Sequence, residues 1–303
     1  MHTTNVCLVL SILVVADRAT AQQLDPGAIR AAANYSANHR GASLLVIEKG
    51  KTLLEEYPGG GSRDTPRKIY SGTKAFWNLA ALAAAEDGLE PGFLLHGRDP
   101  GDRDAIAIKL PLVADPGAAF VYGPSALQVF HRLLKAKLRG EAPKHYLERR
   151  VLRRLGLGPQ RYLQDRAGNP LLAAGWQLTA RQWAKLGKLV LAHGAPVVSS
   201  RSLAECWRGS AANPAFSLGW WNNRAAPMGR DADFERVLNS KGENWDGICL
   251  CRDAPSDLVA CIGSGHQRLY VIPSLQLIVV RHSSGGSFSD ATFLRLLLGW
   301  KRG

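Results

Sequence analysis

Residues 69 to 77 read Ile-Tyr-Ser-Gly-Thr-Lys-Ala-Phe-Trp and place Ser71 and Lys74 three positions apart at the expected start of a helix. From Thr73 onward the chain is rich in alanine and leucine, and Gly88 is a suitable residue to end such a helix. Side chains three residues apart on a helix have Cβ atoms about 5–6 Å from each other. We therefore expect the Lys74 amine to reach the Ser71 hydroxyl, as in an activated serine nucleophile.

The Ser-x-x-Lys spacing also has a second interpretation. A serine that caps the helix, followed by a lysine that points into solvent, produces the same pattern. The chain contains this spacing once, at Ser71 and Lys74. Other motifs are needed to choose between a nucleophile and a helix cap.

Composition and charge are those of a globular enzyme. The chain has 303 residues, of which 46% are hydrophobic and 21% charged, enough to bury a large core. Its formal net charge is +13, but the basic residues are scattered along the sequence and no nucleic-acid-binding motif accompanies them. We expect a small-molecule substrate and no nucleic-acid partner, while binding to an anionic cell-wall polymer or to lipid headgroups stays open.

The N-terminus resembles a secretion signal. An apolar segment from Val6 to Ala16 is followed by Ala19-Thr20-Ala21, the small-x-small pattern of a cleavage site. We therefore predict a signal peptide over residues 1–21, one domain over residues 22–303, and export to the periplasm or beyond. The alternative is an apolar N-terminal helix that stays attached, since no Lys or Arg precedes the apolar segment. No apolar run reaches the roughly 18 residues of a membrane span.

Four cysteines remain after the predicted cleavage, namely Cys206, Cys249, Cys251 and Cys261. Disulfides and buried thiols both account for them, and an oxidising compartment favours at least one disulfide. The sequence has no C-x-x-C and no pair of histidines at ligand spacing, so we predict neither a metal nor another cofactor.

Predicted strands lie at both ends of the chain, with helices between them. Residues 43–48 and 52–57 flank Lys49-Gly50-Lys51 as a hairpin. Apolar periodicity predicts helices near residues 125–134 and 146–155, from Thr179 up to Gly194, and at the C-terminus, whereas residues 90–119 are expected to be loop. Further strands are predicted over residues 247–251, 258–262, 269–272 and 277–281. The predicted fold is α+β, with one antiparallel sheet flanked by helices, an inserted helical lobe, and a cleft between sheet and lobe.

Three motifs in order give the chain a recognisable pattern: Ser71-Gly72-Thr73-Lys74, then Tyr122-Gly123-Pro124-Ser125, then residues 263–273 beginning Gly-Ser-Gly-His-Gln. This pattern resembles the serine β-lactamase and penicillin-binding-protein-like family, and within it the class C-like esterase branch. Residues 175–187 and 217–221 are also similar to segments of that branch, so the likeness spans residues 44–281. The resemblance implies a DD-peptidase/β-lactamase-like fold and a serine hydrolase.

The resemblance also implies roles for individual residues. Ser71 corresponds to the nucleophile, Lys74 to its base, and Tyr122 to the group that passes a proton to the leaving group. An ordinary lysine pKa near 10.4 is too high for a base at neutral pH, so Lys74 must be desolvated or placed beside another cation. The resemblance places the oxyanion donors at the Ser71 amide and on the strand entered through Gly265, with His266 and Gln267 beside the substrate.

Several departures from the family pattern bear on the substrate. Neither Lys-Thr-Gly nor Ser-Asp-Asn occurs, and Tyr122 is followed by Gly-Pro where penicillin-recognising members carry Tyr-x-Asn. Ser264 and His266 stand where the family has the lysine that meets a β-lactam carboxylate. We therefore expect an ester or small-amide hydrolase. The alternative is a β-lactamase-fold binding or sensor protein that acylates weakly or is inactive.

Overall fold

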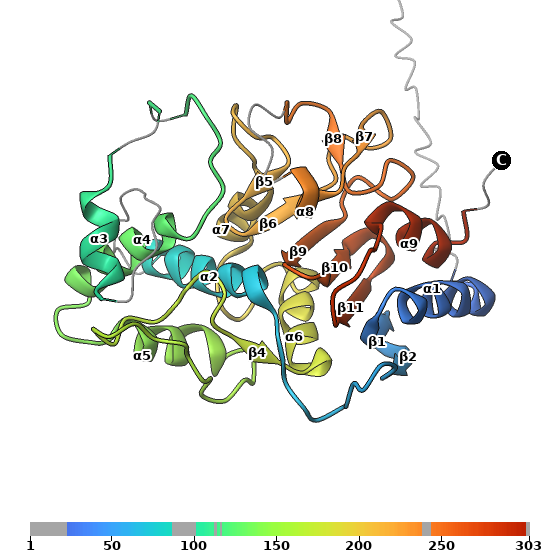
Figure 1. The fold of residues 1–303 in the computed structure, drawn as a ribbon, viewed down its shortest axis with the longest axis horizontal. Coiled ribbons are helices and arrows are strands. Elements are labelled where there is room, and N and C mark those ends of the chain that lie inside the picture. The colour runs from blue at the N-terminus through green and yellow to red at the C-terminus, as the bar shows by residue number, and fades with distance from the viewer. Residues whose placement is uncertain (1–22, 87–100, 112–113, 116, 238–243, 301–303) are drawn as a thin grey trace, which may run out of the picture.

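A computed structural model describes residues 23–86, 101–111, 114–115, 117–237 and 244–300 of the chain (Figure 1). Seven strands form one sheet in which all neighbours are antiparallel. In sheet order they are β2 (Lys51–Glu56), β1 (Gly41–Glu48), β11 (Leu277–Ser283), β10 (Gln267–Ile272), β9 (Val259–Gly263), β6 (Trp220–Asn222) and β5 (Phe216–Ser217). Strands from both ends of the chain therefore share one sheet, which confirms the predicted α+β fold.

The first hairpin forms where the sequence predicts it. Lys49 and Gly50 connect β1 to β2 and both have positive φ, 48° and 78°. A two-residue turn of this kind matches the twist of the strands it joins, and glycine adopts it without a steric cost. This hairpin forms one edge of the sheet, away from Ser71.

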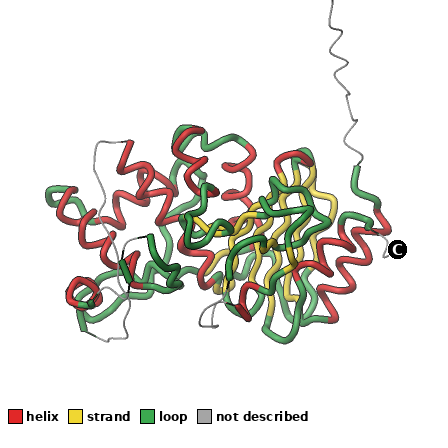
Figure 2. Tube along the Cα trace, turned by 90° about the horizontal axis from the view of Figure 1, so that it is seen from above, coloured by secondary structure: helices red, strands yellow, loops and turns green. Residues whose placement is uncertain are grey.

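Helices cover both faces of the sheet. On one face lie α1 (Pro26–Asn38) and α9 (Asp290–Leu297), which pack against each other; on the other lies α6 (Ala180–Leu191). Alternate strand residues serve the two layers: Val46 and Val279 belong to the core beneath α1 and α9, whereas Leu45 and Val280 belong to the core beneath α6. Figure 2 shows the strands at one end of the molecule, with helices beside them, and a helical lobe at the opposite end.

The lobe is built from α2 (Thr73–Glu86), α3 (Arg103–Lys109), α4 (Ser125–Lys137) and α5 (Pro143–Leu147), with a π-helical turn over Glu148–Leu152. Its helix α2 continues into the core beneath α6 through the buried side chains of Phe76, Trp77 and Leu79. A small pair of strands, β3 (Arg67–Lys68) and β4 (Gln177–Leu178), joins the segments before α2 and α6. The start of α2 is thus held between lobe and sheet.

Shorter elements complete the described fold. They are α7 (Ser200–Ala204), α8 (Phe234–Val237), a parallel pair β7 (Arg230–Asp231) and β8 (Ile248–Cys249), and single 3-10 turns at Tyr70–Gly72, Glu205–Trp207 and Pro273–Leu275. Helix α6 has Thr179 as its N-cap, as predicted: the Thr179 side chain accepts from the Gln182 backbone amide, and the Gln182 side chain accepts from the Thr179 backbone amide. Within the described ranges, no helix has the length and apolar character needed to cross a membrane.

Two expectations about secondary structure need correction. The prediction of loop over residues 90–119 is wrong for Arg103–Lys109, which forms α3 with Asp102 as its N-cap, accepting from the Ala105 amide at 3.0 Å. Helix α1 was not predicted, although Asp25 caps it and Pro26 opens it. The predicted signal peptide and the helix end at Gly88 lie outside the described residues.

The disulfide prediction is also wrong, because all four described cysteines are free and buried. Cys206 and Cys261 belong to the core beneath α6, whereas Cys251 belongs to the core on the opposite face of the sheet. Burial raises the pKa of Cys249 to about 11 and raises the pKa values of the other three thiols as well. These residues act as small apolar side chains in the protein interior.

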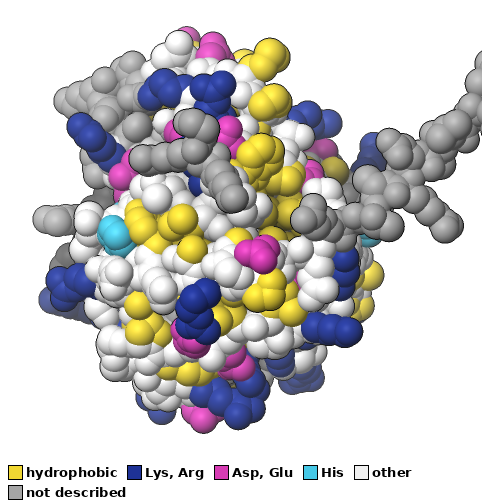
Figure 3. Space-filling view, turned by 90° about the vertical axis from the view of Figure 1, so that its right-hand side faces the viewer, with side chains coloured by type: hydrophobic (Ala, Val, Ile, Leu, Met, Phe, Trp, Pro, Cys, Tyr) yellow, Lys and Arg dark blue, Asp and Glu magenta, His cyan; other side chains and the backbone are white. Residues whose placement is uncertain are grey.

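The face on the α1 and α9 side carries mixed charge. Figure 3 shows Lys and Arg side chains dispersed among acidic, apolar and uncharged ones on this face. An electrostatic binding patch would instead gather one sign of charge. The expectation that nucleic acid is not a partner stays a prediction.

Candidate active site

Ser71 lies in the 3-10 turn Tyr70–Gly72 directly before α2. The turn packs closely on α6, because a Cβ at Gly72 would lie 2.5 Å from Cζ2 of the buried Trp183 ring. Only glycine fits this approach without displacement. Tyr70 has φ 44°, a conformation disfavoured for a residue with a Cβ. Close packing therefore fixes the backbone that carries Ser71.

Lys74 meets Ser71 within the first turn of α2. Its Nζ donates to Ser71 Oγ at 2.7 Å and to the Ala173 carbonyl at 3.2 Å. The lysine is only 6% exposed, and burial lowers its pKa to about 7. No ion pair to Lys74 occurs within the described ranges. A large share of this amine is consequently neutral near neutral pH and able to accept a proton.

Tyr122 lies just before α4 and completes a three-residue group. Lys74 Nζ, which donates to Ser71 Oγ, lies over the Tyr122 ring at 4.7 Å from its centroid. Burial raises the pKa of Tyr122 to about 12, so its hydroxyl keeps its proton. The structure brings the three predicted catalytic side chains together, and the arrangement can move a proton between a hydroxyl, an amine and a phenol. Their roles in catalysis stay predictions.

Aromatic side chains extend from Tyr122 along one side. The Tyr122 ring lies 5.6 Å from Phe216 on β5, which lies 5.3 Å from Phe120, which in turn lies 5.2 Å from Trp245. We call these four residues the aromatic row. All four are partly exposed and rest on the buried core that contains Trp221. The row offers an apolar surface next to the Ser71 hydroxyl.

The end of β9 contacts the turn that carries Ser71. A Cβ at Gly263 would lie 2.1 Å from the Ile69 carbonyl oxygen, so the two backbones approach more closely than any other residue would allow. Ser264 follows Gly263 and is exposed. This strand end therefore lies against the start of the nucleophile turn.

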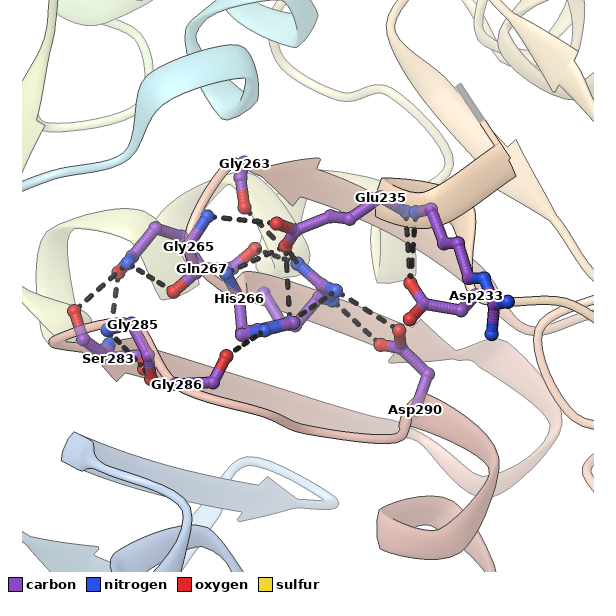
Figure 4. Close-up of polar contacts among 12 residues, drawn as sticks. Asp233, Glu235, Gly263, Gly265, His266, Gln267, Ser283, Gly285, Gly286 and Asp290 are labelled. Carbon is purple, nitrogen blue, oxygen red and sulfur yellow. Dashed lines mark hydrogen bonds and ion pairs between the residues drawn. The ribbon is translucent and has the colours of Figure 1, made fainter. Parts of the chain in front are cut away.

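The other predicted residues of the third motif make intramolecular hydrogen bonds (Figure 4). The Gly265 and His266 amides donate to Glu235 at 3.0 and 2.7 Å, and His266 Nε2 lies 2.7 Å from the Gly286 carbonyl. The side-chain amide of Gln267 donates through Nε2 to the Gly265 carbonyl at 2.9 Å and to the Ser283 carbonyl at 3.0 Å. These contacts build the turn. Sequence reasoning missed Glu235, because no motif marks it and it lies about 30 residues from the turn.

In the described part of the chain, no group of three His, Cys, Asp or Glu side chains lies together as in a metal site. His131 instead contacts the Asp104 carboxylate at 2.6 Å in the interior of the lobe. The chemistry described above needs only the side chains of Ser71, Lys74 and Tyr122.

No protein-family model and no curated protein sequence matches the chain. Solved structures do. A candidate 6-aminohexanoate-dimer hydrolase from Bacillus anthracis has a TM-score of 0.66 at 15% identity, covering 91% of this chain and 84% of that one. A β-lactamase from Mycobacterium bovis has a TM-score of 0.62 at 18% identity, covering 90% and 96% of the two chains. The D-alanine carboxypeptidase AmpC from Burkholderia cenocepacia also has a TM-score of 0.62, at 15% identity, covering 90% and 97%. The chain therefore has the β-lactamase and DD-peptidase-like α+β fold.

Proposed function

We propose that this protein is an exported serine hydrolase that forms an acyl-enzyme at Ser71 and acts on small esters or amides. The observation that carries the proposal is the contact of 2.7 Å between Lys74 Nζ and Ser71 Oγ, made by a lysine whose pKa burial lowers to about 7. A helix-capping serine with a solvent-facing lysine explains neither the burial nor the contact. The fold shared with a carboxypeptidase and a β-lactamase agrees with acyl transfer.

The mechanism follows from the three side chains. The neutral Lys74 amine takes the proton of Ser71 Oγ as that oxygen attacks the substrate carbonyl, and a tetrahedral intermediate forms. Tyr122 donates its proton to the departing alkoxide or amine and regains one from the Lys74 ammonium. The carbon–oxygen or carbon–nitrogen bond breaks, leaving the acyl group on Ser71. Water then attacks the acyl-enzyme ester at Ser71. Lys74 takes a proton from this water and the Ser71 oxygen regains one, so the carboxylic acid and free Ser71 are released.

The oxyanion needs two donors close to Ser71. We infer that the Ser71 amide supplies one and that the end of β9 supplies the other. The resemblance places the second donor on the strand entered through Gly265. The Gly265 amide itself donates to Glu235 in this structure, which favours Ser264 as the second donor. Gly263, in contact with Ile69, brings Ser264 to the nucleophile turn.

Two features support an ester with an apolar group over a β-lactam. Pro124 is the N-cap of α4 and has no amide side chain with which to hold a substrate. The aromatic row lies beside Tyr122, the proposed proton donor to the leaving group, so it suits an apolar or aryl alcohol portion. Export rests on the sequence of residues 1–21, which lie outside the described residues.

The altered motifs also favour a second candidate, a binding or sensor protein of weak activity. In such a protein the acyl group, once attached to Ser71, is removed only slowly. Time-resolved intact mass after mixing with p-nitrophenyl acetate distinguishes the two. A turnover enzyme returns to its free mass while nitrophenol continues to accumulate, whereas a sensor retains an acetyl adduct of one equivalent. Ser71→Ala is the control, and we expect it to show neither adduct nor release above background. An adduct on another residue contradicts both candidates.

A further inference from the structure

The turn from Ser264 to His266, between β9 and β10, is bound by a carboxylate from α8. Glu235 Oε2 accepts from the Gly265 amide at 3.0 Å and Oε1 accepts from the His266 amide at 2.7 Å. Both turn residues have positive φ, 71° and 60°, which for His266 is a disfavoured conformation. Such backbone conformations persist only where surrounding contacts hold them. Glu235 supplies contacts of this kind, in the form of charge-assisted hydrogen bonds.

Arg268 links this carboxylate to the sheet and to α9. Its Nη1 donates to Glu235 Oε1 at 2.8 Å and to the Gly263 carbonyl at 3.2 Å. Its Nε and Nη2 donate to the two oxygens of Asp290 at 2.7 and 3.1 Å. Arg268 is fully buried, and the Glu235 side chain is 22% exposed. Figure 4 shows Glu235, the turn and Asp290 in one network of hydrogen bonds and ion pairs.

This network ends at the backbone that meets the nucleophile turn. Gly263, whose carbonyl accepts from Arg268, is the residue that packs against the Ile69 carbonyl. Ile69 lies two residues before Ser71, and its carbonyl accepts from the Gly72 amide at 3.0 Å. A shift of the turn that changes the position of Gly263 or Ser264 therefore changes the distance between the end of β9 and Ser71.

We propose that Glu235 is a positioning residue of the active site. Its carboxylate holds the turn after β9 so that the strand end presents an amide to the oxyanion that forms on the substrate of Ser71. Glu235 itself touches neither substrate nor reacting atoms. The inference rests on the proposed serine hydrolase function.

Glu235→Gln tests it, because glutamine keeps the size and one acceptor oxygen but loses the charge and the second acceptor. We expect kcat for p-nitrophenyl acetate to fall roughly 10- to 100-fold, with KM changed less than about 3-fold, since the lost contribution acts on the transition state. The rate of Ser71 phosphonylation by a fluorophosphonate should fall in parallel. Glu235→Asp, which keeps a carboxylate, should retain more activity than Glu235→Gln.

Glu205→Gln is the matched control, since the Glu205 side chain is 40% exposed and pairs with Arg208 at 3.2 Å. Rates are measured per folded molecule, well below each variant's Tm. A lower Tm with unchanged kcat assigns Glu235 a purely structural role and overturns the proposal. A raised KM with unchanged kcat also overturns the proposal. If wild-type protein neither turns over the ester nor reacts with the fluorophosphonate, the hydrolase function itself fails, which is a separate outcome.

Discussion

At the scale of single residues, the proton-accepting capacity of Lys74 is the property that the proposed chemistry needs most. Arginine keeps a positive charge at this position but cannot give up its proton near neutral pH. We predict that Lys74→Arg is about as inactive as Lys74→Ala, with kcat/KM for p-nitrophenyl acetate lowered roughly 10²- to 10⁴-fold, the range of general base catalysis. Steady-state assays check this. Recovery of most activity in the arginine variant contradicts a proton-transfer role.

The pH dependence belongs to the same residue. Burial lowers the pKa of Lys74 to about 7, and the neutral amine is the active form. Activity should therefore rise with pH and level off above an apparent pKa of about 7 in a plot of kcat/KM. Tyr122, with its pKa raised to about 12, keeps its proton across this range. The measurement is kcat/KM from pH 5.5 to 9 at constant ionic strength. A profile that is flat from pH 6 to 8 argues against Lys74 as the base.

At the scale of elements, β5 and the segments before α4 and β8 carry the aromatic row that we expect to hold the leaving group. Phe216→Ala removes the ring that contacts both Tyr122 and Phe120. Aromatic contacts contribute about 0.5–1.5 kcal/mol beyond area burial, so kcat/KM for 2-naphthyl acetate should fall roughly 2- to 10-fold. For methyl acetate it should change less than about 2-fold.

Comparing each substrate between wild type and variant cancels differences in leaving-group chemistry. Phe216→Leu, which keeps apolar bulk but not the ring, is the matched control. Its kcat/KM for 2-naphthyl acetate should lie between the values for wild type and Phe216→Ala. If kcat/KM falls equally for 2-naphthyl and methyl acetate in Phe216→Ala, the substitution disturbs Tyr122 in general and the aromatic row is not a binding surface for the leaving group.

Local signals in the sequence predict elements well where the stabilising contacts are also local. The Lys49-Gly50 turn and the Thr179 cap depend on residues within three positions of each other, and both are found. Glu235 instead acts on a turn 30 residues away, and nothing near it in sequence indicates this. For the same reason the orientation of the Gly265 amide was not predictable from the motif.

At the scale of the whole molecule, strand-like segments near both ends of the sequence predicted a sheet built from both ends of the chain. The disulfide prediction from the cysteine count was wrong, because four cysteines are equally compatible with a disulfide framework and with a buried core. Their positions on opposite faces of the sheet depend on the packing of both layers, which the spacing of cysteines does not reveal. The Ser71 site was more predictable because Ser71 and Lys74 meet within one helical turn, and Tyr122 lies beside Lys74 at the start of α4.

The choice of substrate depends on the whole cleft, because an ester and a β-lactam need different numbers of binding groups. Both need the oxyanion donors and a protonated leaving atom, but a β-lactam also needs its carboxylate and its side-chain amide held. Pro124 offers no amide to do this, and the third motif has no lysine. Each lost hydrogen bond to a charged group costs about 1.5–3 kcal/mol, so two such losses lower kcat/KM roughly 10²- to 10⁴-fold.

We therefore predict that p-nitrophenyl acetate or butyrate is hydrolysed at least about a hundredfold more efficiently than a chromogenic cephalosporin, on the basis of that difference in binding contacts. Parallel steady-state assays at one pH measure kcat/KM for each substrate, with Ser71→Ala as the blank. The blank separates catalysis at the site from hydrolysis on basic surface residues. An equal or higher kcat/KM for the cephalosporin contradicts the ester preference while leaving Ser71 as nucleophile. Ester hydrolysis that persists in Ser71→Ala removes the support for both, because the activity then arises elsewhere on the protein.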